Sequence, residues 1–205
     1  MPALAATLGK VTNNEPLTLR AISANHRLGD AAAAARVVHY VLDEKASEQE
    51  QAYAVEALQH WTTPDRIDLV DGFHRGLPER ESHLAASALK PYLAAFLAVP
   101  RAETRTAAME LARNYQLTIP HETLLTLAQD PVSPGPIRAE ALHTLGQSPN
   151  DAVFTLLEQL LSDDDTHVAI AALDQWVKHR PDEAAREIQR RVESKAPLEV
   201  RQHAI

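Results

Sequence analysis

The sequence has no cysteine and few aromatic residues, and each shortage excludes a class of structure or chemistry. Without cysteine, the 205 residues hold no disulfide, no thiolate metal ligand, no cysteine nucleophile and no Cys-x-x-Cys-His haem attachment. Aromatic residues make up 4% of the chain and hydrophobic residues 45%, so we expect a folded protein with an aliphatic core. Six glycines occur, and none belongs to a Gly-x-Gly-x-x-Gly or Gly-x-x-x-x-Gly-Lys nucleotide-binding loop.

Basic residues and long apolar runs are also too few for two kinds of partner. Lys and Arg number 20 against 28 Asp and Glu, which gives a net charge of −8. Because affinity for phosphates comes from clustered Lys and Arg, this balance argues against nucleic acid. No apolar run reaches the roughly 18 residues that a membrane span needs. The N-terminal residues Met1–Leu4 lack the features of a signal peptide, and the sequence leaves the compartment unknown.

A short alanine-centred pattern recurs along the chain. Its clearest copies are Thr104–Met109, Ile137–Leu142 and Val200–Ile205, each with arginine at the second position, and Val168–Leu173 keeps all but the arginine. Spacings just over 30 residues fit a unit of two helices of about 12 residues with two short turns. The central alanines are spaced 33, 51, 33, 31 and 32 residues apart, and the long spacing indicates one unit with an insertion at about 62–80; they are Ala24, Ala57, Ala108, Ala141, Ala172 and Ala204.

The spacing of apolar residues within the units is helical. Ile137, Ala141, Leu142 and Leu145 stand at i, i+4, i+5 and i+8, which predicts one apolar stripe, and no segment alternates with period two. Within the insertion the pattern predicts a helix over Ile67–Leu77 and a second over Leu84–Leu97, in which Pro91 either kinks the helix or starts a new turn. Gly29 and Gly146 each follow an anchor alanine by five residues and are predicted to end helices in the left-handed conformation. Further helices are predicted at Leu17–Leu28, Ala31–Leu42, Thr123–Gln129 and Val153–Leu161.

The run Asp163–Leu173 and the Arg-x-x-Ala copies at Arg105 and Arg138 resemble the HEAT repeat family. The resemblance covers about residues 15–205. It implies an all-α, right-handed α-solenoid of about six HEAT-like two-helix repeats, with one longer unit that carries the insertion. It also implies a ladder of arginines and aspartates between successive repeats. Arg105, Arg138 and Arg201 match the arginine position, whereas two other copies carry alanine there, so we expect a discontinuous ladder.

We expect residues 1–205 to form a single repeat array, with a partial unit at 1–29 and a truncated unit at 182–205. Solenoid ends usually carry polar capping repeats, and because neither end shows one we expect a piece of a larger protein. The stretch from Trp61 to Pro78 is similar to the HEAT segment of large bacterial proteins that also carry a sorbosone-dehydrogenase-like β-propeller and a c-type haem domain. That similarity implies an alternative function, the connecting segment of an exported, periplasmic dehydrogenase-like protein whose other domains lie outside this chain.

Histidines and acidic clusters are the candidates for chemistry. Metal sites need several converging ligands, but no two of the ten histidines are four residues apart, and His121-Glu122 is the single His-Glu pair. HEAT-like di-iron hydroxylases repeat such a pair in several units. We therefore expect no metal, no cofactor and no catalytic residue. The acidic runs Asp163–Asp165 and Asp182-Glu183 offer either a surface for a basic partner or favourable charges at helix starts, and we favour the second interpretation. Trp61 and Trp176 are predicted to lie in the core.

With no catalytic constellation in sight, we expect a non-catalytic scaffold that contacts a protein or a flanking domain of the parent chain. A helix turns about 100° per residue, so positions two after each anchor alanine point away from the apolar stripe. In HEAT solenoids this side of the second helix lines the concave surface. The row is polar throughout, which favours either a partner-binding groove or an ordinary solvated face; it comprises His26, Gln59, Glu110, His143 and Asp174. The third positions after the anchors are also predicted to point away from the stripe; they are Arg27, His60, Leu111, Thr144 and Gln175.

Overall fold

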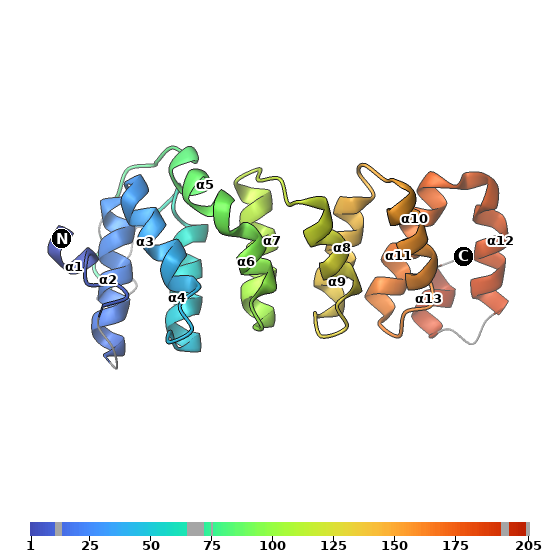
Figure 1. The fold of residues 1–205 in the computed structure, drawn as a ribbon, viewed down its shortest axis with the longest axis horizontal. Helices are drawn as coiled ribbons and strands as arrows, with labels where there is room; N and C mark the ends of the chain where they lie inside the picture. Colours follow the sequence, from blue (N-terminus) through green and yellow to red (C-terminus); the bar gives the residue numbers. More distant parts are fainter. Residues whose placement is uncertain (11–13, 65–71, 75, 194–196, 204–205) are drawn as a thin grey trace. The chain divides into compact units, whose positions relative to one another are not determined.

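Every regular element in the described part of the chain is a helix, which confirms the all-α prediction. The computed structural model describes residues 1–10, 14–64, 72–74, 76–193 and 197–203 (Figure 1). The chain divides into two compact units, unit 1 at Met1–Ile119 and unit 2 at Pro120–Ile205. None of the described helices is both long enough and apolar enough to cross a bilayer.

Unit 1 is built from helices that contact in consecutive pairs. Helix α1 contacts α2, α3 contacts α4, and α6 contacts α7, while α4 also lies between α2 and α7 and contacts both (Figure 1). A 3₁₀ turn at Lys90–Tyr92 separates α5 from α6. The helices are α1 (Pro2–Ala5), α2 (Glu15–Leu28), α3 (Ala31–Val41), α4 (Glu48–Gln59), α5 (His83–Leu89), α6 (Leu93–Ala98) and α7 (Ala102–Asn114).

Unit 2 shows the same kind of packing. Helix α8 contacts α9, α10 contacts α11, and α12 contacts α13, while α11 also contacts both α9 and α13 (Figure 1). The predicted helices in this region are confirmed to within two residues at their ends. The helices are α8 (His121–Gln129), α9 (Gly135–Leu145), α10 (Asp151–Leu160), α11 (Thr166–His179), α12 (Pro181–Glu193) and α13 (Leu198–His203).

Side-chain caps fix the starts of several helices. Ser47 and Glu50 form a reciprocal capping box at α4, and Asp165 accepts a hydrogen bond from the His167 N–H at α11. These bonds satisfy backbone N–H groups that have no partner within the helix. Asp182 and Glu183 lie in the first turn of α12, as the helix-start interpretation of the acidic runs predicted.

The core is aliphatic, as the composition predicted. Four anchor alanines, at positions 24, 108, 141 and 172, are at most 2% exposed, whereas Ala57 is half-buried. Trp61 is fully buried and Trp176 is 7% exposed, so both tryptophans belong to the core. Each unit therefore contains one buried tryptophan, and most of the other buried side chains are Leu, Val, Ile and Ala.

The predicted helix over Ile67–Leu77 is wrong in its second half. Residues 72–74 and 76–81 are not helical, while 65–71 and 75 lie outside the described residues. Gly72 has a φ of 69°, a left-handed value that a helix does not use, and Gly76 and Pro78 disfavour a helix further along. The predicted helix over Leu84–Leu97 is present but interrupted, because Pro91 lies in the 3₁₀ turn between α5 and α6.

A buried polar cluster joins α2, α3 and α4. The side chains of Thr18, Tyr40 and Glu50 are each less than 9% exposed. Burial, with Glu50 nearby, raises the pKa of Tyr40 to about 12. Burial alone would raise the pKa of Glu50 as well, but hydrogen bonds from the Ser47 N–H and from the Thr18, Tyr40 and Ser47 hydroxyls outweigh it and lower that pKa. Glu50 therefore stays ionised as a structural acceptor between three helices.

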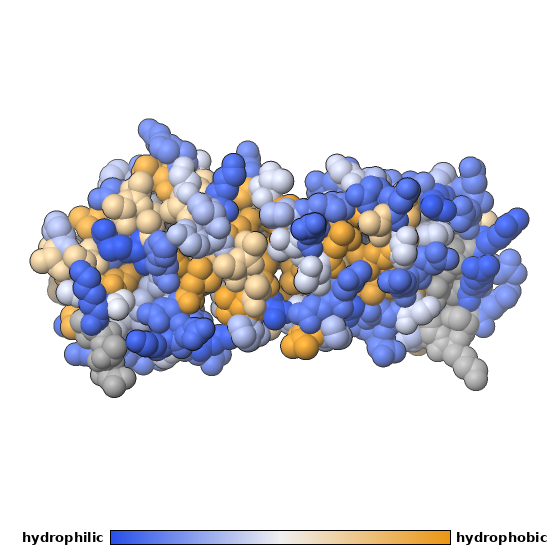
Figure 2. All heavy atoms as spheres, in the orientation of Figure 1, coloured by the Kyte–Doolittle hydropathy of each residue, from blue (hydrophilic) through white to orange (hydrophobic). Residues whose placement is uncertain are grey.

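The surface of the chain differs in polarity from one helix to another. Figure 2 shows apolar side chains over α3, α5 and α6, where Ala94, Ala95 and Ala98 are exposed on α6. The surface over α12 is mainly hydrophilic in the same view, and Arg186 and Arg190 are exposed on that helix. The predicted partner-binding row lies on other helices, α2, α4 and α7 in unit 1 and α9 and α11 in unit 2.

Candidate functional site

The predicted row in unit 1 forms hydrogen bonds between neighbouring helices. The Gln59 Nε2 amide on α4 donates to Glu110 Oε2 on α7 at 2.8 Å, and both residues belong to the row. His26 Nε2 on α2 lies 3.1 Å from the carbonyl oxygen of His60, which follows the last residue of α4. All three row residues are half-buried. Their polar groups therefore link α2, α4 and α7 sideways as well as lining one face of these helices.

Unit 2 repeats this arrangement. His143 Nδ1 on α9 lies 3.0 Å from Gln175 Nε2 on α11, so the imidazole accepts from the amide at this nitrogen. Asp174 Oδ1 on α11 lies 2.7 Å from His203 Nε2 on α13. Each of the five predicted residues thus forms a polar contact with a neighbouring helix of its own unit, or with the residue that directly follows that helix. We name the surface formed by α2, α4 and α7 the second-helix face of unit 1, and the surface formed by α9, α11 and α13 the second-helix face of unit 2.

The prediction for the third positions after the anchors is wrong at Leu111 and Gln175. Leu111 is fully buried and Gln175 is 6% exposed. Three residues turn a helix by about 300°, which leaves the third position only about 60° from the anchor, on the same side of the helix. Such a side chain enters the contact with a neighbouring helix, whereas the second position lies nearly opposite the anchor.

Gly146 ends α9, but not in the left-handed conformation that the sequence predicted. Its φ is −68° and its ψ is −5°, whereas Gly29 does adopt the predicted left-handed conformation with a φ of 67°. A Cβ atom on Gly146 would lie 1.9 Å from Gln175 Oε1 and 2.5 Å from its Cδ. The Gln175 side chain therefore occupies the space that a Cβ atom at position 146 would take, whereas the backbone conformation of Gly146 is one that any residue can adopt.

We predict that Gly146→Ala destabilises unit 2 by about 1–2 kcal/mol, because Gln175 must leave its buried position and its bond to His143. Urea denaturation gives the change in the free energy of unfolding. In a Gln175→Ala background the same substitution meets no obstacle, and its cost is expected to fall below about 0.5 kcal/mol. An equal cost in both backgrounds would show that Gln175 is not the reason for the glycine.

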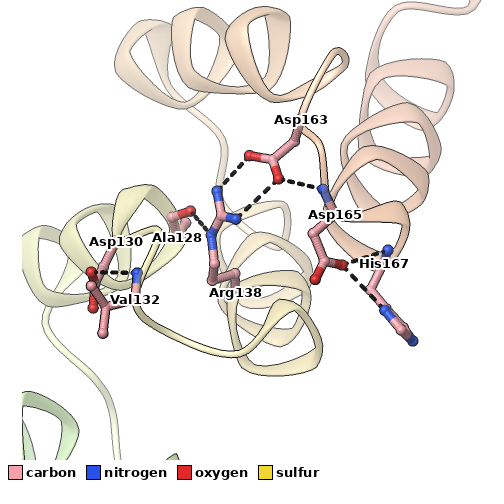
Figure 3. Close-up of polar contacts among 7 residues, drawn as sticks. All are labelled: Ala128, Asp130, Val132, Arg138, Asp163, Asp165 and His167. Atoms are coloured by element: carbon pink, nitrogen blue, oxygen red, sulfur yellow. Dashed lines mark hydrogen bonds and ion pairs between the residues drawn. The ribbon is translucent and has the colours of Figure 1, made fainter. Parts of the chain in front are cut away.

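The guanidinium of Arg138 in unit 2 binds groups from two other segments of the chain (Figure 3). Arg138 lies on α9 and donates from Nε to the Ala128 carbonyl oxygen on α8 at 2.9 Å. Its two terminal nitrogens bind the two oxygens of Asp163, from the loop between α10 and α11, at 3.0 and 2.5 Å. Asp163 Oδ1 also accepts from the Asp165 N–H at 3.0 Å. One guanidinium thus ties together α8, α9 and the loop that leads into α11.

Arg105 occupies the equivalent position in unit 1. Its Nε on α7 donates to the Val99 carbonyl oxygen, just after α6, at 2.6 Å, and its side chain is buried. Arg105 and Arg138 therefore perform the same task, because each binds a carbonyl at the end of the helix that precedes its own. In the sequence, Asp163 precedes its anchor alanine, Ala172, by nine residues, and Val132 precedes Ala141 by the same number. The aspartate position is thus filled by an apolar residue in the loop before α9, where Val132 is 78% exposed.

A small pocket lies between α4 and α7 on the second-helix face of unit 1. Its volume is about 220 Å³. The buried side chains of Val55, Thr104 and Ala107 form its floor, and the exposed residues Glu48 and Glu103 stand at its rim. The lining also includes Ala52 and Arg101. Sequence reasoning missed this pocket, although Glu48, Ala52, Val55 and Gln59 follow one helical stripe that leads from the predicted row toward it.

Two of the histidines that we considered as metal ligands form contacts within unit 2. His121 Nε2 lies 3.1 Å from Asn150 Nδ2, whose Oδ1 caps α10. His179 Nε2 lies 2.8 Å from the Gly146 carbonyl oxygen. Among the residues that the structure describes, no three His, Asp or Glu side chains converge in a way that could hold a metal ion.

Comparison with known proteins adds no relative to this picture. The sequence matches no protein-family model and no curated protein, and the structure matches no solved structure.

Proposed function

We propose that the chain is a HEAT-like α-solenoid whose second-helix face binds a protein segment or a flanking domain, as a non-catalytic scaffold. Two observations support the solenoid. Within each unit, the second helix of one pair contacts the second helix of the next, as in α2, α4 and α7, or α9, α11 and α13. Arg105 and Arg138 also form the same bond to the preceding helix in different pairs. Equivalent contacts in successive pairs are what a repeat architecture requires.

The proposed binding function is supported by the side chains of the second-helix faces, which form polar bridges between helices and line a pocket. Polar side chains bridge neighbouring helices along these faces, as in Gln59–Glu110 and Gln175–His143, and hold the helices at fixed spacing. In unit 1, a pocket between the same two helices that Gln59 and Glu110 join has an apolar floor formed by Val55 and Ala107. A fixed surface that combines apolar pockets with polar rims is typical of protein interfaces.

The solenoid predicts a shape that small-angle X-ray scattering can measure. A compact globule of this length has a radius of gyration of about 17 Å. Helix pairs stacked in one direction bury their core only between neighbours, so we expect a clearly larger radius. A value at the globular figure would contradict the solenoid and leave only an all-α protein.

Photocrosslinking from two matched positions tests the binding function. Ala52 is exposed on α4, on the second-helix face, and Ala95 is exposed on α6, in the proposed first-helix layer. A photoreactive phenylalanine derivative at each position, in cells that make the protein, is expected to give a discrete protein adduct from position 52 and none from position 95. Adducts from position 95 alone, or from neither position, would contradict a scaffold that binds through the second helices.

A further inference from the structure

The pocket between α4 and α7 is too small for a cofactor and large enough for a side chain. Sites for small molecules usually enclose about 300–1,000 Å³, and this pocket encloses about 220 Å³. Its floor is made by Val55, Thr104 and Ala107, which are each at most 9% exposed. An aliphatic side chain that enters it gains contact with these residues and leaves water. The size and the lining therefore fit one apolar side chain of a larger partner.

The charges at the rim of the pocket determine which partner peptides can place an apolar side chain in it. Glu48 on α4 and Glu103 on α7 are both exposed at the pocket, one from each wall. Neither carboxylate forms an ion pair within the part of the chain that the structure describes. The single cation of the lining, Arg101, donates to Gln51 Oε1. The rim thus presents two carboxylates that can bind cations of a partner.

The walls of the pocket are already in place. Arg101 bonds Gln51, and Gln59 bonds Glu110, so two side-chain bonds connect α7 with α4 beside the pocket. Tyr115, which follows α7, donates to the Leu58 carbonyl oxygen at 2.6 Å and adds a third connection. A site that is held open before binding loses little conformational entropy when it is occupied.

We propose that this pocket binds an extended peptide segment with one aliphatic side chain between two lysines or arginines. Alternate side chains of an extended chain point to the same side, so cations two residues before and after the aliphatic residue face the same surface as it does. The aliphatic side chain fills the space above Val55 and Ala107, and the two cations meet Glu48 and Glu103. This assignment rests on the proposed scaffold function and specifies the partner that the second-helix face of unit 1 binds.

The probe is the synthetic peptide acetyl-Lys-Ser-Leu-Ser-Lys-amide, titrated into the ¹⁵N-labelled full chain and followed by NMR at low salt. We expect saturable shifts in the amide signals of α4 and α7, centred on Ala52, Val55 and Ala107. A peptide with serine in place of leucine is expected to bind about tenfold more weakly, since it buries no aliphatic side chain. A peptide with glutamate in place of both lysines is expected to give no saturable shifts. Equal binding by all three peptides would overturn the proposal.

Protein variants test the same contacts from the other side. Glu48→Lys with Glu103→Lys is expected to weaken the first peptide at least fivefold, because two favourable charge pairs become repulsive. The control, Glu44→Lys with Glu158→Lys, changes the net charge equally at exposed sites elsewhere and is expected to leave the affinity unchanged. An equal loss in both double variants would overturn the proposal, because only net charge would then matter.

A second pair of variants blocks the pocket without touching the charges. Ala52→Phe places a ring over the pocket from an exposed position and is expected to abolish the shifts, whereas Ala152→Phe, at an exposed position on α10, is expected to retain them. Circular dichroism verifies that both variants keep their helices. Full binding by Ala52→Phe would overturn the proposal.

The remaining outcomes separate this proposal from the scaffold function. If the protein alone forms dimers that Glu48→Lys with Glu103→Lys disrupts, the occupant is a second copy and the peptide assignment is wrong. If the peptide fails while position 52 still gives a photocrosslinked adduct, the face binds a partner of another chemistry, and only the peptide assignment falls. If the peptide does not bind and position 52 gives no adduct, both the peptide assignment and the proposed scaffold function are wrong.

Discussion

Replacing Asp163 with alanine is expected to lower the free energy of unfolding of unit 2 by about 3 kcal/mol. The substitution removes both carboxylate contacts of Arg138 and the bond from the Asp165 N–H. The Arg138 side chain is 7% exposed, so its guanidinium is left buried with only the Ala128 carbonyl (Figure 3). Removing one member of a buried pair costs about 3–5 kcal/mol, and we place this pair at the lower end because Asp163 is 14% exposed and water can partly replace it. Urea denaturation measures the change.

Asp164 provides a matched control next to the pair. It is exposed and forms no hydrogen bond or ion pair among the described residues, so Asp164→Ala is expected to change the free energy of unfolding by less than about 0.5 kcal/mol. The combined substitution Arg138→Met with Asp163→Leu removes both charges and is expected to be less harmful than Asp163→Ala alone. Equal effects of Asp163→Ala and Asp164→Ala would show that solvent screens the pair and that it does not hold the helices together.

The helices of this chain were predictable because their signals are local. Apolar spacing within α9 and α11, and the glycine after α2, depend on residues less than three turns apart. The same locality explains the failure at Ile67–Leu77. The prediction there rested on the spacing of apolar residues, although Gly72, Gly76 and Pro78 each disfavour a helix.

The candidate site was predictable only in part, because its contacts join residues far apart in the sequence. The helical repeat placed Gln59 and Glu110 at equivalent positions, but not at hydrogen-bonding distance, which depends on how α4 and α7 align. Gly146 shows the same limit, since the side chain that lies against it, Gln175, is on the next helix of the row. The pocket depends on the short side chains of Ala52 on α4 and Ala107 on α7, which both line it. Sequence periodicity predicts the face of the helix on which a residue lies, but it does not predict which residue of another helix that residue contacts.

Replacing Trp61 with alanine is expected to destabilise unit 1 by about 4 kcal/mol, the largest effect that we predict. Its side chain is fully buried at the end of α4. Its ring meets the His26 imidazole edge-on at 5.5 Å, and the Arg80 guanidinium lies 5.6 Å from its centre. Alanine leaves a cavity where α2, α4 and the segment before α5 meet, and it removes these ring contacts. Urea denaturation monitored by circular dichroism gives the loss, with unit 2 followed separately by the fluorescence of Trp176.

Trp61→Phe separates the volume of the ring from its polar atom. The Trp61 Nε1–H is buried without a hydrogen-bond partner, so phenylalanine removes an unsatisfied donor while it keeps most of the aromatic contact. We therefore expect Trp61→Phe to cost less than about 1.5 kcal/mol, well below the alanine variant. If the two variants lose the same stability, the indole nitrogen and not the packed ring is what unit 1 needs. If Trp176 fluorescence changes at the same urea concentration at which unit 1 unfolds, the two units unfold together.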